Sequence, residues 1–486
     1  MAQQHFDRLS AIDASFLHQE GANSHMHVGA VTIFEGPPPR YEEFLDSIRG
    51  RLHLVPRYRQ KLTFPRFETG RPLWVDDPSF NLEFHVRQTA LPRPGAEGQL
   101  MRLTARIFSQ QLDRTKPLWE LWMIEGVEPA TPGGSHRFAL ISKSHHALID
   151  GVSGIDLASV LFDLSPVPPE TAHPDEAWSP EPVPSAAQVI ASGALGAVRM
   201  GIGGVTRALG VVTKPTAVLG ELREAAEGVG EIVWAGLNPA PATPLNVPIG
   251  PHRRFVGVRS ELQDFKLVKN TFGGTVNDVV LTAVSGSLRQ FLRLRGIRAE
   301  GLELRALVPV SIRADDERGQ FGNRIAAMRG PLPVYVEDPV ARLQTVKAAM
   351  DDLKESKMAV GAEVLASVQN FAPPTVLAQA SRLNFSTRLF NLIVTNVPGP
   401  QFPLYTRGRE MQDVFPVAFL PEDHALAIAI MSYNGKVNFG LLGDYDALGD
   451  IQTLADGIEQ SLAELVALAK KRGAGDGAAA RPLTPA

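Results

Sequence analysis

Hydrophobic positions along this chain follow two spacings in turn, one typical of strands and one typical of helices. Residues 26–36 and 138–141 are apolar runs of strand length, the first rich in Val, Ile and Phe. Residues 41–53 and 100–112 instead repeat their apolar side chains every three or four positions, which predicts helices. Strands and helices that alternate along one chain predict an α/β fold, with mixed β-sheets flanked by helices.

The second half of the chain predicts the same mixture of elements. An apolar run at residues 307–312 predicts a buried strand, and Pro339 suits the first position of a helix. Asn277 precedes a helical run and is a candidate N-cap. The Asn-Gly pair inside residues 426–442 predicts a β-hairpin, and residues 451–465 predict a last amphipathic helix.

Two proline-rich tracts divide the chain of 486 residues. Residues 165–185 contain seven prolines and cannot hold a regular element, and a second tract covers residues 238–251. A chain of this length is also long for a single core. We therefore expect an N-terminal half at residues 1–170, a proline-rich and helical crossover at 171–250, a C-terminal half at 251–471 and a disordered tail at 472–486.

The composition is that of a globular protein, with 44% hydrophobic and 21% charged residues. A net charge of -4 provides no global basic field for nucleic acid. The absence of cysteine excludes disulfides, thiolate catalysis and Cys-ligated metal. The N-terminus lacks the layout of a signal peptide, and no run of 18 apolar residues occurs, so we expect a cytoplasmic protein.

One stretch between a predicted strand and a predicted helix carries candidate chemistry. It contains His145, His146, Asp150 and Gly151 in the pattern HHxxxDG. An imidazole has an ordinary pKa near 6.5, so it can accept a proton from a nucleophile at neutral pH and later return it. Asp150 could orient an imidazole or pair with a cation, and Gly151 permits a tight turn.

Two other interpretations of this stretch stay open on the residues alone. A histidine on an apolar strand can be a packed core residue, and an Asp-Gly pair can be a simple turn. With average residue usage, however, the four residues at these offsets should occur by chance in roughly one chain in a thousand. A metal site needs three or four ligands, which His25 and His27 could complete only from a distance. The pattern favours a general base.

Nine motifs, taken in order, resemble the bacterial bifunctional wax ester synthase/diacylglycerol acyltransferase family. The likeness extends over residues 9–468. The motifs are LSxxDxxFL at residues 9–17, MHVG at 26–29, PLWE at 117–120, HHALIDG at 145–151, IGPHRR at 249–254, TVNDVVL at 275–281, GNR at 322–324, TNVPGP at 395–400 and SYNGKVNFG at 432–440. HHxxxDG alone would also fit chloramphenicol acetyltransferase and the condensation domains of peptide synthesis.

The resemblance implies two chloramphenicol acetyltransferase-like halves, each a mixed β-sheet flanked by helices, with a tunnel and an active site at their interface. It implies an O-acyltransferase that moves a long-chain acyl group from acyl-CoA to diacylglycerol or a fatty alcohol. His146 would act as general base without an acyl-enzyme. Acyl-CoA is then a substrate, and we expect no cofactor and no metal.

The resemblance also suggests roles for single residues. His145 would support the loop, although the family treats both histidines as functional, and Asp150 would pair with Arg313. Asn277 is a candidate donor to the oxyanion, with the N-cap as its competing role. Among the cations, Arg253 and Arg254 are candidate partners of the CoA phosphates.

Two other functions compete with this expectation. A condensation-type acyltransferase would use the same base on a polyketide or peptide alcohol delivered by a carrier protein, and release of free CoA would distinguish the two. A non-catalytic scaffold of lipid inclusions would keep only the fold, and the intact HHxxxDG motif argues against it. The hydrophobic substrates favour peripheral attachment to the inner membrane face or to lipid inclusions.

Overall fold

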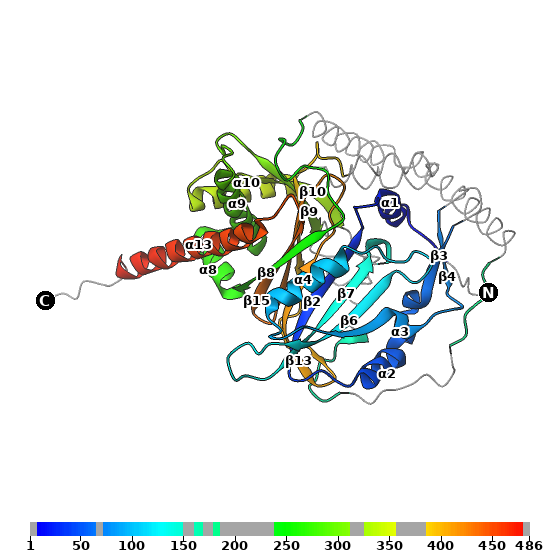
Figure 1. The fold of residues 1–486 in the computed structure, drawn as a ribbon. Helices are drawn as coiled ribbons and strands as arrows, with labels where there is room; N and C mark the ends of the chain where they lie inside the picture. The colour runs from blue at the N-terminus through cyan, green and yellow to red at the C-terminus, as the bar shows by residue number, and fades with distance from the viewer. Residues whose placement is uncertain are drawn as a thin grey trace, which may run out of the picture.

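Two six-stranded mixed β-sheets form the framework of the computed structural model (Figure 1). Their mixed character confirms the predicted fold class. The structure describes residues 7–64, 71–148, 160–168, 178–184, 238–311, 325–355 and 385–479.

The first sheet has the strand order β12-β13-β2-β7-β6-β5. Its central strand β7 pairs antiparallel with β2 on one side and with β6 on the other, while β5 runs parallel to β6 at the edge. The strands are β2 (His27–Glu35), β5 (Val86–Ala90), β6 (Trp119–Val127), β7 (Arg137–His145), β12 (Tyr405–Thr406) and β13 (Arg409–Val417). A small sheet beside it has the order β1-β4-β3, formed by β1 (Asp7–Arg8), β4 (Leu73–Asp76) and β3 (Gln60–Thr63).

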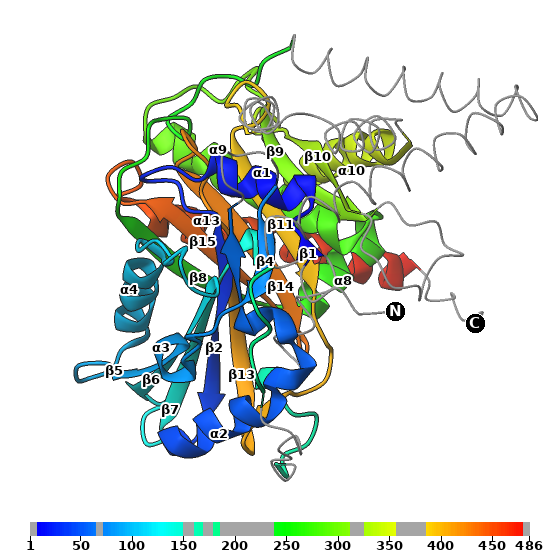
Figure 2. The same cartoon turned by 90° about the vertical axis from the view of Figure 1, so that its right-hand side faces the viewer.

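The helices of the first half are α1 (Ala11–Gln19), α2 (Tyr41–Arg51), α3 (Leu82–His85) and α4 (Glu97–Phe108). Helix α1 lies across one end of the first sheet, beside the turn that follows β7 (Figures 1 and 2). Helix α4 packs against β8 of the second sheet, so a helix of the first half contributes to the contact between the halves.

The second sheet has the order β10-β9-β11-β14-β15-β8. Its strands are β8 (Arg253–Glu261), β9 (Leu304–Ser311), β10 (Ile325–Leu332), β11 (Leu392–Pro398), β14 (Leu426–Tyr433) and β15 (Lys436–Asp444). The helices α8 (Leu262–Phe272), α9 (Val276–Leu294), α10 (Pro339–Glu355) and α13 (Ile451–Ala479) gather on one side of it (Figure 1). A continuous apolar core joins these helices to the sheet and reaches α4 of the first half.

The strand β13 connects the two halves in a way that the division into contiguous segments did not anticipate. It lies between β11 and β14 in the chain, yet it pairs antiparallel with β2 of the first sheet. It also packs on β14 and β15 of the second sheet. The two sheets approach closely here, because a Cβ atom on Gly440 would lie 1.9 Å from the carbonyl oxygen of Pro416. The proposed boundaries at 170 and 250 therefore separate chain segments rather than sheets.

Several predicted elements agree with the structure, and the predicted N-cap of α9 was wrong. The hairpin forms as expected, with positive φ at both Asn434 and Gly435. The N-cap of α9 is Thr275 rather than Asn277, because the Thr275 hydroxyl accepts from the Asp278 amide and the Asp278 carboxylate accepts in return. Helix α13 continues through Ala479, beyond the predicted end of the C-terminal half at residue 471.

Replacing Thr275 with Ala should lower the free energy of unfolding by about 1 kcal/mol, because the first turn of α9 loses its capping acceptor. Thr345→Ala is the matched control, since the hydroxyl of Thr345 only bonds the Ala341 carbonyl within α10. Chemical denaturation monitored by circular dichroism measures both. Equal effects of the two substitutions would contradict the capping role.

Candidate active site

The histidine pair lies at the last residue of a buried central strand and the first residue of the turn after it. His145 ends β7, and a single 3₁₀ turn, His146–Leu148, follows. The His145 amide donates to the Leu118 carbonyl at 2.9 Å, and the His146 amide donates to the Met26 carbonyl at 2.7 Å. The backbone of the pair is therefore held on both sides by the residues that directly precede β6 and β2, which fixes the Cα positions of both histidines.

The His146 ring lies among phenylalanines from distant parts of the chain. Phe16 of α1 stacks on it with ring centroids 4.0 Å apart, and Phe419 meets it edge-on at 5.7 Å. Phe385 contacts both of these rings. Phe16 precedes β2, whereas the other two rings come from the second half, so His146 lies where segments of both halves meet. The surroundings are apolar and suit a lipophilic substrate.

Burial controls the charge of His146. It lowers the pKa of the imidazole from 6.5 to about 4, and an interaction with the residue's own backbone opposes this shift without cancelling it. Nδ1 is buried and has no partner within normal hydrogen-bonding geometry. The ring is therefore neutral at pH 7 and retains a lone pair that can accept a proton.

The His145 ring points back into the protein. It is 1% exposed, and its Nδ1 accepts from the Ala147 amide at 3.0 Å. Burial and the charge of Arg114 lower the pKa of His145 to about 3, so this ring is neutral as well. The bond to Ala147 ties the strand end to the turn that carries His146.

A buried carboxylate, Glu20, lies on the far side of His145. Arg114 binds it through two donors, with Nε at 2.8 Å, and the carboxylate side chain is 1% exposed. Three histidine rings face the same carboxylate, with nitrogen–oxygen distances of 3.7 Å for His145, 3.6 Å for His27 and 3.9 Å for His25. We define Glu20, Arg114, His25, His27 and His145 as the Glu20 cluster.

The Glu20 cluster brings together the histidines that a metal site would need. The distances of 3.6 to 3.9 Å between the histidine nitrogens and the Glu20 oxygens are longer than hydrogen bonds. In the part of the chain that the structure describes, no three His, Asp or Glu residues are arranged to hold a metal ion. Burial lowers the pKa of His27 well below 6.5 and that of His25 to about 4. The histidines of the cluster are thus neutral at pH 7 beside a charged pair.

Three of the predicted site residues, Asp150, Gly151 and Arg313, lie outside the described residues. Asn277 is the second residue of α9, and its side-chain oxygen accepts from the side-chain Nδ2 of Asn396 in β11 at 3.2 Å. This hydrogen bond leaves the amide group of Asn277 as a donor. Its predicted role toward an oxyanion stays a prediction.

The two arginines predicted to meet CoA phosphates make contacts within the protein. Arg253 is 6% exposed and donates to the carbonyl oxygens of Gly250, His252 and Asn23. It thereby links the loop after α1 to the start of β8. Arg254 is half-buried, stacks over the Tyr445 ring at 3.9 Å and donates to the Tyr445 carbonyl. Of the two, Arg254 is the more accessible cation.

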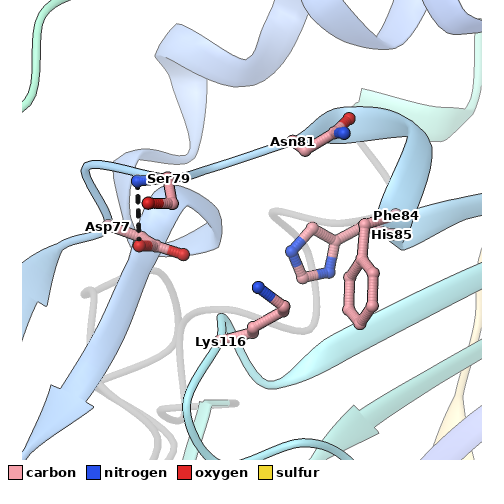
Figure 3. Close-up of a pocket in the computed structure, with 6 residues that line it drawn as sticks. All are labelled: Asp77, Ser79, Asn81, Phe84, His85 and Lys116. Atoms are coloured by element: carbon pink, nitrogen blue, oxygen red, sulfur yellow. Dashed lines mark hydrogen bonds between the residues drawn. The ribbon is translucent and has the colours of Figure 1, made fainter.

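A surface pocket of about 190 Å³ lies apart from the histidine pair. Its lining residues, shown in Figure 3, are Asp77, Ser79, Asn81, Phe84, His85 and Lys116. Asp77 accepts from Lys61 and from the Ser79 amide, and His85 is sandwiched between Phe80 and Trp119. None of the predicted site residues lines this pocket, so its polar groups are not part of the candidate active site.

Four residues of the site were not singled out from the sequence. Phe16 lies in the LSxxDxxFL motif, and Arg114 lies just before PLWE, but neither had been assigned a role. Glu20 and Phe419 lie outside the motifs. The signal that could have found Glu20 is its place three residues after the first motif, at the end of a helix that also supplies Phe16.

Comparisons with known proteins identify the family. Residues 9–280 match the wax ester synthase/diacylglycerol acyltransferase catalytic domain, and residues 321–466 match the WS/DGAT C-terminal domain. A probable diacylglycerol O-acyltransferase of Mycobacterium tuberculosis H37Rv, tgs1, is 36% identical over 470 residues, which are 96% of this chain and 97% of that protein.

Solved structures agree with these matches. The wax ester synthase/diacylglycerol acyltransferase from Marinobacter aquaeolei VT8 is 28% identical, covers 96% of this chain and 100% of its own, and gives a TM-score of 0.66. The starter condensation domain of rhizomide synthetase RzmA is 13% identical with a TM-score of 0.57, covers 96% of this chain and 95% of its own, and shares the fold alone. The chain belongs to the wax ester synthase/diacylglycerol acyltransferase family and is an O-acyltransferase.

Proposed function

We propose that the protein transfers a long-chain fatty acyl group from acyl-CoA to the hydroxyl of diacylglycerol or of a fatty alcohol. The products are triacylglycerol or a wax ester, together with free CoA. The observation that carries the proposal is His146, a neutral histidine directly after β7 whose ring packs among phenylalanines of both halves. The family match supports this substrate class, because the matched domain and the Marinobacter protein are named for wax ester synthesis and diacylglycerol acylation, and tgs1 is named for diacylglycerol acylation.

In the proposed reaction His146 acts as the general base. Its Nδ1 is buried, so Nε2 is the nitrogen we assign to the substrate side. Nε2 takes the proton of the alcohol while the oxygen attacks the thioester carbonyl. The carbon–sulfur bond then breaks, and the imidazolium returns the proton to the departing CoA thiolate. The apolar rings around His146 exclude water, which favours transfer to the alcohol over hydrolysis.

We further propose that the acyl group passes directly to the alcohol without an acyl-enzyme. A covalent route needs a nucleophilic side chain hydrogen-bonded to the base. The chain has no cysteine, and within the described ranges Nδ1 of His146 has no hydrogen-bond partner. A single imidazole suffices for direct transfer, because the proton that it removes from the alcohol is the proton that the thiolate needs.

The other parts of the site are assigned on chemical grounds. The amide of Asn277 is our candidate donor to the developing oxyanion, since it keeps free hydrogens while its oxygen is bound by Asn396. Arg254 is our candidate for a CoA phosphate. No cofactor or metal is needed in this scheme, because acyl-CoA is itself a substrate.

We also propose that the protein works at the surface of the inner membrane or of lipid inclusions. None of the helices in the described part of the chain is long and apolar enough to cross a bilayer. Diacylglycerol and fatty alcohols reside in lipid phases, so an enzyme that uses them must bind reversibly at such a surface.

Replacing His146 with Ala should lower the rate of CoA release from palmitoyl-CoA by about 10²- to 10⁴-fold, the usual contribution of a general base. The assay supplies either diacylglycerol or hexadecanol, and the faster acceptor defines the main product. His136→Ala is the matched control, because that histidine is exposed on a loop. Wild-type protein that is folded but releases no CoA with either acceptor would refute the proposed function.

The pH dependence should reflect the apolar surroundings of His146. Its pKa of about 4 lies below the ordinary 6.5, so protonation removes the base only as the pH falls toward 4. We expect kcat/KM to be flat between pH 8 and pH 6 and to fall only below about pH 5. Circular dichroism at each pH confirms that the protein stays folded. An acidic limb centred near pH 6.5 would contradict a base whose pKa is lowered by its surroundings.

A further inference from the structure

Helix α1 touches the histidine pair at two points. Phe16, on its last turns, stacks on the His146 ring at 4.0 Å. Glu20, the C-cap residue of the same helix, faces Nε2 of His145 at 3.7 Å. One short helix therefore contacts both rings of the pair, from a segment more than 100 residues away in the sequence.

The carboxylate of Glu20 is itself fixed in place. Arg114 donates to it from Nε and from the terminal guanidinium nitrogen, and also donates to the Leu17 carbonyl of α1 at 3.0 Å. The Glu20 side chain is 1% exposed, whereas that of Arg114 is 34% exposed. A buried carboxylate is costly unless it is paired, so its presence beside a histidine calls for a functional explanation.

The hydrogen bonds of His145 determine which of its nitrogens carries the proton. Nδ1 accepts from the Ala147 amide, so in the neutral ring the hydrogen must be on Nε2. Nε2 is buried and lacks a partner within hydrogen-bonding distance. The Glu20 oxygen that it faces is Oε2, which Arg114 already binds and which has a further lone pair for a second donor. A shift of less than 1 Å from the 3.7 Å separation would form an Nε2–H to carboxylate bond.

We propose that Glu20 is a positioning residue of the acyltransferase site. Held by Arg114, it accepts from His145 and keeps that ring in the tautomer that binds the Ala147 amide. The Ala147 amide belongs to the turn that carries His146, so this chain of contacts fixes the direction of the catalytic ring. Glu20 acts through His145 and does not touch the substrates. The kinetic part of the inference rests on the proposed function.

Two substitutions of Glu20 distinguish the effect of its hydrogen-bond acceptor from the effect of its negative charge. Glu20→Leu removes the acceptor, and Arg114 is exposed enough to turn to water. Glu20→Gln keeps an oxygen for Arg114 and His145 but removes the charge. We expect Glu20→Leu to lower kcat by about tenfold or more, as is typical when an orienting partner of a functional histidine is removed from a metal site. KM for palmitoyl-CoA should stay unchanged, and Glu20→Gln should retain most of the activity.

Asp163→Asn is the matched control for lost stability. Asp163 is a buried carboxylate paired with Arg51, and it does not contact the histidine pair. Rates are normalised to the folded fraction from circular dichroism. The proposal predicts an unchanged kcat for Asp163→Asn. Equal kcat values for Glu20→Leu and Asp163→Asn would overturn it.

A spectroscopic measurement tests the same inference without turnover. Long-range proton–nitrogen correlation spectra of histidine-labelled protein distinguish the two tautomers, and His145→Gln identifies the signal. We expect His145 to carry its proton on Nε2 in the wild type and to show a mixture of tautomers in Glu20→Leu. A proton on Nδ1 in the wild type, or an unchanged spectrum in Glu20→Leu, would overturn the proposal. This result stands even for a protein that proves inactive with both acceptors.

Discussion

The site depends on the hydrogen bonding that holds β7 between β2 and β6 up to its last residue. Because the His145 amide bonds Leu118 and the His146 amide bonds Met26, neither residue of the pair can shift without breaking a sheet contact. The backbone of His146, directly after this strand, therefore has little conformational freedom. Pre-organisation of this kind lets a single base be effective, since no rotamer search precedes proton transfer.

The electrostatic surroundings divide the pair into two roles. His146 faces phenylalanines, and burial keeps it neutral, so it can accept a proton. His145 faces the Glu20 carboxylate, whose charge is balanced by Arg114. Two adjacent histidines would interfere with one another if both were charged. His146 contacts apolar rings and can act as a base, whereas His145 faces a paired carboxylate and can act as a structural donor.

Structural features that depend on local sequence could be predicted. The apolar run before His145 marks a strand, and Asn434-Gly435 marks a hairpin, because both signals lie within a few residues. The cap of α9 was misassigned although Thr275 and Asp278 form a capping box, since Asn277 is also a good cap residue and stands nearer the apolar run. The end of α13 is hard to predict from sequence, because alanines, which favour helix, are mixed with glycines, which disfavour it, in residues 473–479.

The contacts across the chain could not be predicted in the same way. The stacking of Phe16 on His146 joins residues 130 positions apart, and it exists only because α1 lies over the end of the first sheet. The pairing of β13 with β2 also brings Phe419 to the site. No local sequence pattern indicates that β13, from the C-terminal half of the chain, joins the sheet formed by the N-terminal half. Such contacts depend on sheet register and topology, which a single sequence does not encode locally.

The central claim is that the acyl group passes directly from CoA to an alcohol activated by His146. The most direct test mixes the enzyme with a small excess of palmitoyl-CoA and no acceptor, and then records CoA release and the intact mass of the protein. Direct transfer predicts no burst of CoA and no gain of a palmitoyl group until alcohol is added. A stoichiometric burst of CoA with a palmitoylated protein would contradict the account.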